Sequence, residues 1–468
     1  MRDFLIKHLK ENNTIFHMPG HKGPGIYEKY GYTDFLEHFM ECDITEIPGA
    51  DNLHQPEGII ADIQNRYERL YGVKKSYILV NGTSCGIVAS ILASVKRGGK
   101  MIVSRGCHRS VYSGLSLGEI TPCYVQPETT KEGLMGALEW EKVAKALLEN
   151  PEAEAVILPS PNYYGICSDI EKIAEEVHKH GKILIVDQAH GAHLHLFEKY
   201  LGKNTGLPRA AEDLGADIVI NSTHKTLATF TQSAILNVIS DKVDTFKLEN
   251  YLHMVQSTSP SYLLMTSHDI NSKIIEDHGK EIFKNWLEDL QWFYKEADKK
   301  LIAQWDHLDF TKINIDSKAI GWTGSQMEEY LMENKIVPEM VTDNLVVAMS
   351  GIGNVREDYC KLKEVLEGAK SKALEMETME FVEKAQTKTV YPETKVIDHG
   401  ETIIEVPLRE AVGYACGDVL IPYPPGIPMV CPSEMVTGDI VACIENITGE
   451  GRQVLGLSEE GAIHVYEK

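Results

Sequence analysis

Between residues 75 and 240, short apolar runs alternate with segments of helical periodicity. The apolar runs are SYILV, KMIVS, EAVILPS, KILIVD and ADIVINS, at 76–80, 100–104, 154–160, 182–187 and 216–222. Helical spacing follows two of them, in GIVASILASV and in EKIAEEVHKH. Apolar strands separated by helices are typical of a mainly parallel sheet that is covered on both faces. Ligands of such sheets gather at the carboxyl ends of the strands, so the polar residues after each run are the candidates for chemistry.

The pattern changes after residue 266. Apolar residues at helical spacing predict a long connecting helix within 267–305. DFTKINID and NLVVAMS are typical of strands, with helices predicted at 325–334 and at about 356–378. A break at 387–395 precedes IPYPPGIP (421–428), whose prolines favour a rigid extended path. We therefore predict an N-terminal segment (1–50), a large α/β domain (51–266), and a linker helix with a smaller α+β C-terminal domain (267–468).

Composition narrows the class of protein. A chain of 468 residues is too long to fold around one hydrophobic core of ordinary size, so more than one domain is expected. Its net charge of −23 argues against nucleic-acid and anionic-membrane partners. The nine cysteines are scattered and form no CxxC pair, which indicates neither a disulfide framework nor a zinc site. The N-terminus lacks the apolar core of a signal peptide, and no apolar run is long enough to span a membrane. We expect a cytoplasmic protein with a small-molecule substrate.

The first candidate for chemistry is Lys225 in NSTHKT, at the end of the ADIVI strand. A Schiff-base lysine needs a site where its amine can lose a proton and meet an aldehyde. The neighbouring Ser222, Thr223 and His224 offer groups that could bind a phosphate. Taken alone, a lysine after a strand is more often an exposed residue.

Three further segments follow other strands. Asp187 ends the KILIVD strand, where a carboxylate can pair with a protonated pyridine nitrogen. NGTSCG (81–86) leads into a helix N-terminus, where free N–H groups and hydroxyls can bind an anion. His108 follows KMIVS and could stack on a planar ring. Helix capping explains an isolated Asp, Thr or Ser equally well.

The order of these residues is more informative than any one of them. An anion-binding turn, a histidine, an aspartate and a lysine follow successive strands. This arrangement resembles that of the pyridoxal-5'-phosphate (PLP) enzymes related to aspartate aminotransferases. His190, His193 and His195 also stand close together in sequence, but no matching cysteine or acid cluster accompanies them, and we predict no metal site.

A narrower resemblance rests on motifs that extend from residue 17 to about 436. The chain resembles the short bacterial form of the ornithine/lysine/arginine decarboxylase family. The motifs are HMPGHK (17–22), NLHQPEG (52–58), NGTSCG (81–86), VDQAHGAH (186–193), STHKT (222–226), STSPSYLLM (257–265) and PYPPGIP (422–428). The resemblance implies a PLP-dependent fold with a large and a small domain, working as a homodimer or larger assembly.

The resemblance also implies roles for individual residues. Lys225 would hold PLP as a Schiff base, His108 would stack on its ring, and Asp187 would pair with the pyridine nitrogen. His190 would lie beside the ring near its phenolic oxygen. The remaining expected cofactor contacts are Thr83, Ser84, Cys85, Ala189, Ser222 and His224. HMPGHK and STSPSYLL would lie near the active site, of this subunit or of a partner subunit.

The chain departs from the family pattern at several positions. Gln188 stands where the family commonly has Glu, and Arg109 where Lys is common. Tyr414 replaces the usual arginine, and Asp418 stands where a glutamate is expected to meet the distal cation of the substrate. The resemblance therefore implies decarboxylation of a basic amino acid, with arginine first and lysine or ornithine next. Two alternatives stay open: transamination or elimination on the same scaffold, and a binding protein without catalysis.

Overall fold

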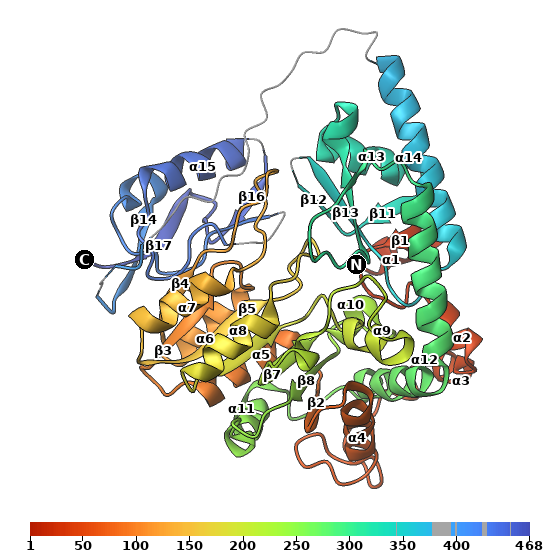
Figure 1. Cartoon of the computed structure of the whole chain (residues 1–468), viewed down its shortest axis with the longest axis horizontal. Coiled ribbons are helices and arrows are strands. Elements are labelled where there is room, and N and C mark those ends of the chain that lie inside the picture. Colours follow the sequence, from red (N-terminus) through yellow and green to blue (C-terminus); the bar gives the residue numbers. More distant parts are fainter. Residues whose placement is uncertain (343, 377–394, 398–399, 424–427, 450) are drawn as a thin grey trace.

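The computed structural model describes residues 1–342, 344–376, 395–397, 400–423, 428–449 and 451–468. Among these residues, the largest sheet has seven strands in the order β2-β8-β7-β6-β5-β3-β4 (Figure 1). Strands β3 to β7 are parallel, and β8 lies antiparallel to both of its neighbours. The bounds are β2 Lys75–Leu79, β3 Lys100–Ser104, β4 Thr121–Val125, β5 Ala153–Pro159, β6 Ile183–Asp187, β7 Ile218–Asn221 and β8 Ala234–Val238.

Successive residues of these strands point to opposite faces of the sheet, and both faces are apolar. In β3, Met101 and Val103 belong to the hydrophobic cluster that includes α5, α6 and α11. Ile102 between them belongs to the cluster that includes α7 and α8. The helices are α5 Gly82–Ser94, α6 Arg109–Leu117, α7 Trp140–Glu149, α8 Ile170–Lys179 and α11 Thr245–Val255. This two-sided cover explains why the strands are continuous apolar runs.

A long helix, α12 (Tyr262–Glu296), leads from the large sheet to a second sheet of order β12-β13-β10-β9 (Figure 1). The strands of this sheet are antiparallel, and β1 pairs in parallel with β11 beside it. The apolar face of α12, including Trp286 and Phe293, is buried. The bounds are β9 Ile302–Ala303, β10 Lys312–Asp316, β11 Ile336–Pro338, β12 Met340–Val341, β13 Leu345–Met349, α13 Gly324–Glu333 and α14 Arg356–Met376.

The C-terminal strands and α15 (Gly438–Gly449) surround a hydrophobic cluster of their own. β14 (Ile403–Pro407) pairs with β17 (Ala462–Tyr466), and β15 (Ile421–Tyr423) with β16 (Gln453–Leu455). A buried ion pair joins this unit to the end of β3: Arg105 contacts the carboxylate of Glu434 at 2.6 Å. Arg105 also donates to the carbonyls of Pro428 and Met429, so its charge is fully compensated.

The N-terminal segment and the remaining helices complete the fold. Their bounds are α1 Arg2–Glu11, β1 Thr14–Phe16, α2 Gly25–Lys29, α3 Thr33–Glu37, α4 Ile59–Tyr71, α9 Leu194–Leu201 and α10 Thr223–Thr226. Within the described ranges, no helix combines the length and the apolar character that crossing a membrane requires.

The predicted strands and the mainly parallel sheet are confirmed, with bounds that differ by at most three residues. The linker helix is also confirmed, although it begins earlier than the predicted 267–305, because the Ser261 side chain caps it by accepting from the Leu264 N–H at 3.4 Å. The predicted break falls outside the described residues except for Lys395, as do residues 424–427 of IPYPPGIP. The division into domains at residues 50 and 266 stays a prediction.

Candidate active site

Lys225 lies on α10, a single turn of helix directly after β7. The HMPGHK segment packs against this turn from the same chain: the Gly20 N–H donates to the carbonyl of His224 at 2.7 Å. A side chain at Gly20 would approach the carbonyl carbon of Thr226 to 2.4 Å, so only glycine fits there. On its other side, the Ile352 N–H donates to the Thr226 carbonyl at 2.9 Å. The turn that carries Lys225 is thus held between two distant parts of the chain.

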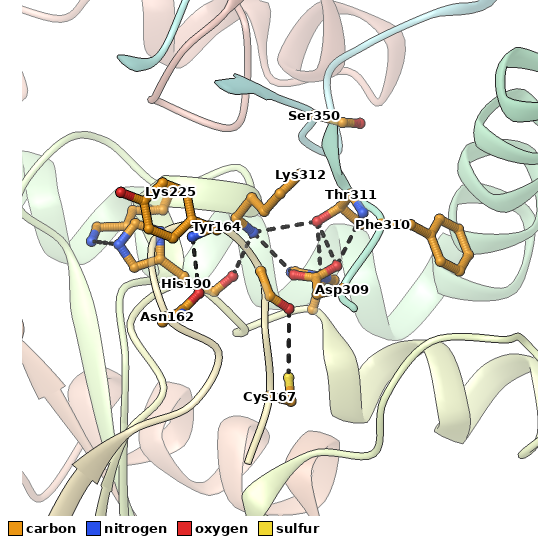
Figure 2. Close-up of polar contacts among 12 residues, drawn as sticks. Asn162, Tyr164, Cys167, His190, Lys225, Asp309, Phe310, Thr311, Lys312 and Ser350 are labelled. Carbon is orange, nitrogen blue, oxygen red and sulfur yellow. Dashed lines mark hydrogen bonds and ion pairs between the residues drawn. The ribbon is translucent and has the colours of Figure 1, made fainter. Parts of the chain in front are cut away.

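The amine of Lys225 lies 2.9 Å from Nε2 of His190 (Figure 2). It also lies 6.0 Å from the ring centroid of Tyr163, and that ring is tilted by 56° relative to the imidazole of His190. Burial lowers the pKa of Lys225 to about 8, although the carboxylates of Asp187 and Glu339 oppose this change. A substantial fraction of the amine is therefore neutral near physiological pH, as a nucleophile requires.

Asp187 ends β6 and is buried. Its Oδ1 accepts from the N–H of Ala189 at 3.1 Å, while its Oδ2 has no hydrogen-bond partner among the described residues. Burial raises the pKa of Asp187, and the charge of Lys225 opposes that rise. A buried carboxylate with one free oxygen is suited to accept from a cationic donor.

His108 caps the N-terminus of α6. Its Nδ1 accepts from the N–H of Ser110, so the neutral ring carries its proton on Nε2. Burial, together with the charges of Lys225 and Arg109, lowers the pKa of His108 to about 4. The ring is therefore an uncharged imidazole at neutral pH, which suits stacking on a flat ligand.

The predicted anion-binding residues lie at two helix starts. Thr83, Ser84 and Cys85 form the first turn of α5, whose N–H groups have no partner within the helix. Ser222 caps α10, and its hydroxyl lies 3.4 Å from that of Thr83. The Cys85 thiol points back to the carbonyl of Gly82 at 3.1 Å, which leaves only its backbone N–H for a ligand.

His224 was expected to donate a hydrogen bond to a phosphate, but its neutral ring has no proton available for this. Its Nδ1 must donate to the Ser233 carbonyl, 2.8 Å away, so neutral His224 has only a lone pair on Nε2. Burial lowers the pKa of His224 to about 4. His224 can therefore donate to a phosphate only as an imidazolium, a form that a phosphate dianion would itself stabilise.

One pocket brings these residues together. Six of the predicted site residues line it, along with five residues that the sequence did not single out. The lining residues are Thr83, Gly106, His108, Pro159, Pro161, Asn162, Tyr163, Asp187, Ala189, His190 and Lys225. A wider and more open pocket between residues 205–208 and 304–310 contains none of the predicted site residues.

Asp418 is not part of this pocket. It is exposed in the C-terminal unit, and its carboxylate accepts from the N–H of Val419 at 2.7 Å. The expected contact between Asp418 and a substrate stays a prediction. Tyr414, which stands in place of an arginine, has the amine of Lys468 over its ring at 4.1 Å.

The histidines of HGAHLH have separate partners. His190 contacts Lys225, His193 lies 3.2 Å from Asp309, and His195 lies 2.8 Å from Asp213. Nδ1 of His190 is buried without a partner among the described residues. An unpaired buried nitrogen in a pocket wall is typical of a group whose partner is a ligand or water.

The sequence interpretation missed Asn162, Tyr163, Lys312 and Asp309. Asn162 and Tyr163 come three and four residues after the end of β5, so the rule that polar residues after each strand carry chemistry could have found them. Asp309 and Lys312 lie in the DFTKINID strand region, where alternating polar residues are usually exposed. Nothing in the sequence marks these two as buried.

Gln188, which stands in place of a glutamate, has a structural explanation. Its side-chain amide donates to the buried carboxylate of Glu212 at 2.7 Å and to Asn221 at 3.0 Å. The other oxygen of Glu212 accepts from Asn221 and Asn237. A glutamate at 188 would face a second carboxylate inside the protein. The amide at 188 and the carboxylate at 212 therefore form a complementary pair, next to Asp187.

We expect Gln188→Glu to lower the free energy of unfolding by about 3 kcal/mol or more, because it places two buried carboxylates in contact. Chemical denaturation measures this change. The exchanged variant Gln188→Glu/Glu212→Gln restores one donor and one acceptor and should recover more than half of the loss. Equal stability of the two variants would contradict this account of Gln188.

Comparison with known proteins gives a consistent result. Residues 1–319 match the family model described as Orn/Lys/Arg decarboxylase, major domain. An uncharacterized protein of Bacillus subtilis is 31% identical over 97% of this chain and 95% of its own length. The arginine decarboxylase of Bacillus subtilis is 28% identical over 98% of this chain and 96% of its own length.

A solved structure shows the same fold. The lysine decarboxylase of Francisella novicida superposes with a TM-score of 0.75 at 18% identity, covering 96% of this chain and 78% of that chain. The mainly parallel sheet with a smaller C-terminal part is therefore an arrangement that this chain shares with a known enzyme.

Proposed function

Because the chain belongs to the Orn/Lys/Arg decarboxylase family and is thus a PLP-dependent decarboxylase of a basic amino acid, we propose that its substrate is arginine and that Lys225 carries the cofactor. The observation that carries this proposal is the single pocket that contains Lys225, Asp187, His108, His190 and Thr83. An amine, a carboxylate, a neutral imidazole and a helix start are the groups that PLP requires, and each of them comes from a position that the family motifs mark.

The residues of the pocket fit the cofactor chemically. Lys225 offers an amine with a pKa of about 8, and Asp187 offers a free carboxylate oxygen for a protonated ring nitrogen. The start of α5 and Ser222 offer N–H and hydroxyl donors for a phosphate. His190 has a buried nitrogen without a partner among the described residues. When bound, PLP supplies an aldehyde for the amine and an electron sink for the bond that breaks.

The side chains of the pocket divide the proton chemistry between them. The buried carboxylate of Asp187 has a hydrogen-bond donor for one oxygen, and the other oxygen is available to a ligand. Its negative charge therefore stabilises a positive charge on the group that pairs with it. His108 and His190 have lowered pKa values and hold no extra proton at neutral pH. Lys225 is therefore the group that delivers a proton to the substrate carbon from its Nζ.

Arginine is preferred over lysine and ornithine because full-length relatives are named arginine decarboxylases. The strongly acidic chain is compatible with any cationic substrate.

We expect the purified enzyme, supplied with PLP, to release CO2 and agmatine from arginine at least about tenfold faster per active site than CO2 from lysine or ornithine. Amine products are separated by chromatography, and CO2 is measured in parallel. Cadaverine or putrescine as the main product would contradict the choice of arginine. A keto acid without CO2 would contradict decarboxylation itself.

We further propose that the chain works as a homodimer or larger homo-oligomer in the cytoplasm. The apolar side chains of α1 support an assembly, since Phe4 is 66% and Leu9 73% exposed. Asp418 also lies outside the pocket of its own chain. The nine free cysteines support a reducing compartment. Light scattering of the purified protein tests the oligomeric state, and a monomer at working concentration would contradict it.

A further inference from the structure

Lys312, at the start of β10, is a lysine with no solvent exposure. Its ammonium donates to three oxygens: the carbonyl of His190 at 2.8 Å, the carboxylate of Asp309 at 3.0 Å, and the hydroxyl of Thr311 at 3.3 Å (Figure 2). A buried ammonium is costly unless each N–H finds an acceptor. All three N–H groups of Lys312 do so.

Asp309 is equally buried and uses its other oxygen differently. That oxygen accepts from the N–H of Thr311 at 3.1 Å and from its hydroxyl at 2.7 Å, and it lies 3.2 Å from Nε2 of His193. Burial would raise the pKa of Asp309, but Lys312 and His193 outweigh burial and hold it well below its ordinary value. The Asp309 carboxylate is therefore ionised at neutral pH.

The two partners contact the two ends of one turn in the large domain. Lys312 binds the backbone of His190, and Asp309 binds the ring of His193. Between them, the N–H of Gly191 donates to the carbonyl of Gln188, and a side chain at Gly191 would clash with Pro161 at 2.6 Å. The turn is thus tightly packed, and its first residue is the one whose imidazole contacts the amine of Lys225.

We propose that the Lys312–Asp309 ion pair positions Lys225: by binding the His190 carbonyl and the His193 ring it holds the His190 imidazole against the Lys225 amine, with the Lys312 end of the pair on the side of His190. Lys312 reaches the amine through His190, so it is a positioning residue and not a catalytic one. The inference rests on the proposed role of Lys225 as the anchor of the cofactor.

Electrostatics support the geometry. Burial is the largest cause of the lowered pKa of Lys225, and the charge of Lys312 acts in the same direction. Charged and titratable groups face Lys225 from the large sheet, from α6 and from the small domain. They are Asp187, His190, His108, Tyr163, Glu339 and Lys312. The two carboxylates favour the charged amine, so Lys312 offsets part of their effect.

A purely structural ion pair would give a different result from a positioning pair. Arg105–Glu434 is a matched control, because it is also a buried pair between distant parts of the chain. Neither residue lines the pocket or contacts His190. A loss of stability by itself should leave the pH dependence of the Lys225 amine unchanged, whichever of the two ion pairs is removed.

The test uses the full-length chain freed of cofactor, labelled with acetic anhydride between pH 6 and pH 10. Mass spectrometry measures how fast Lys225 is acetylated at each pH, and circular dichroism verifies folding. In the wild type we expect the labelling midpoint near pH 8. In Asp309→Asn/Lys312→Met, which leaves no buried charge unpaired, we expect the midpoint to rise by about one pH unit. At pH 7 the rate should then fall about tenfold.

The control variant Arg105→Met/Glu434→Gln should keep the wild-type midpoint even where its thermal stability falls. An unchanged midpoint in the folded Asp309→Asn/Lys312→Met variant would overturn the proposal. An equal rise in the control would overturn it as well, because general loosening would then explain the shift. Labelling needs no substrate, so a failure of the decarboxylation assay leaves this result interpretable.

Discussion

Replacing Lys225 with alanine should abolish the visible absorbance of the bound cofactor and lower the rate of CO2 release by at least about a thousandfold. The reason is geometric, because Lys225 is the one lysine that lines the pocket among the residues that the structure describes. The amine of Lys225 is also the group that returns a proton to the substrate carbon in our account. Absorbance spectra of the purified variant, with and without added PLP, measure the first effect, and a CO2 assay measures the second.

Lys199→Ala is a suitable control. Lys199 donates to the carbonyl of Leu70 at 2.8 Å and lies outside the pocket, so its loss should leave both the spectrum and the rate within about twofold. A Lys225→Ala protein that kept the visible band unchanged would show that the cofactor is attached elsewhere.

Replacing Asp187 with asparagine should keep the cofactor in place but lower the rate about a thousandfold. Asparagine has nearly the same shape as aspartate, and its amide oxygen can still accept from Ala189. It carries no negative charge, however, and so cannot hold a proton on a ring nitrogen. The visible band should persist while the turnover number falls.

Asp217→Asn provides the matched control, since Asp217 is an equally buried carboxylate next to the same sheet. It contacts His178 at 2.9 Å and the N–H of Leu184 at 2.8 Å, away from the pocket. We expect that variant to lose stability but to keep its turnover number within about threefold. Similar losses of turnover in both variants would contradict a specific role for Asp187.

The sequence predicted the large sheet well because its strands are buried on both faces. Ile102 packs on one side and Met101 on the other, so the run appears as continuous apolar residues. The carboxyl ends of parallel strands meet at one edge, which is why Asp187 and Lys225 could be expected near each other despite their separation in sequence. The structure places both in one pocket.

The sequence could not predict the contacts of polar residues whose position in a strand is more often explained by solvent exposure. Lys312 and Asp309 stand near a strand in which polar residues alternate with apolar ones, a pattern that favours exposure. Tertiary packing against the HGAH turn and against Gly165 buries them. Asp418 is a different case: a motif identified the residue type, but its role stays a prediction, and the residue is exposed in the C-terminal unit.

The most direct test of the account is to reduce the PLP-loaded wild-type enzyme with borohydride, digest it, and identify the modified peptide by mass spectrometry. Reduction fixes the cofactor on the lysine that holds it. We predict a pyridoxyl phosphate group on Lys225 and on no other lysine. Modification of a different lysine, or no modification of an enzyme that releases CO2, would contradict the assignment on which the whole account depends.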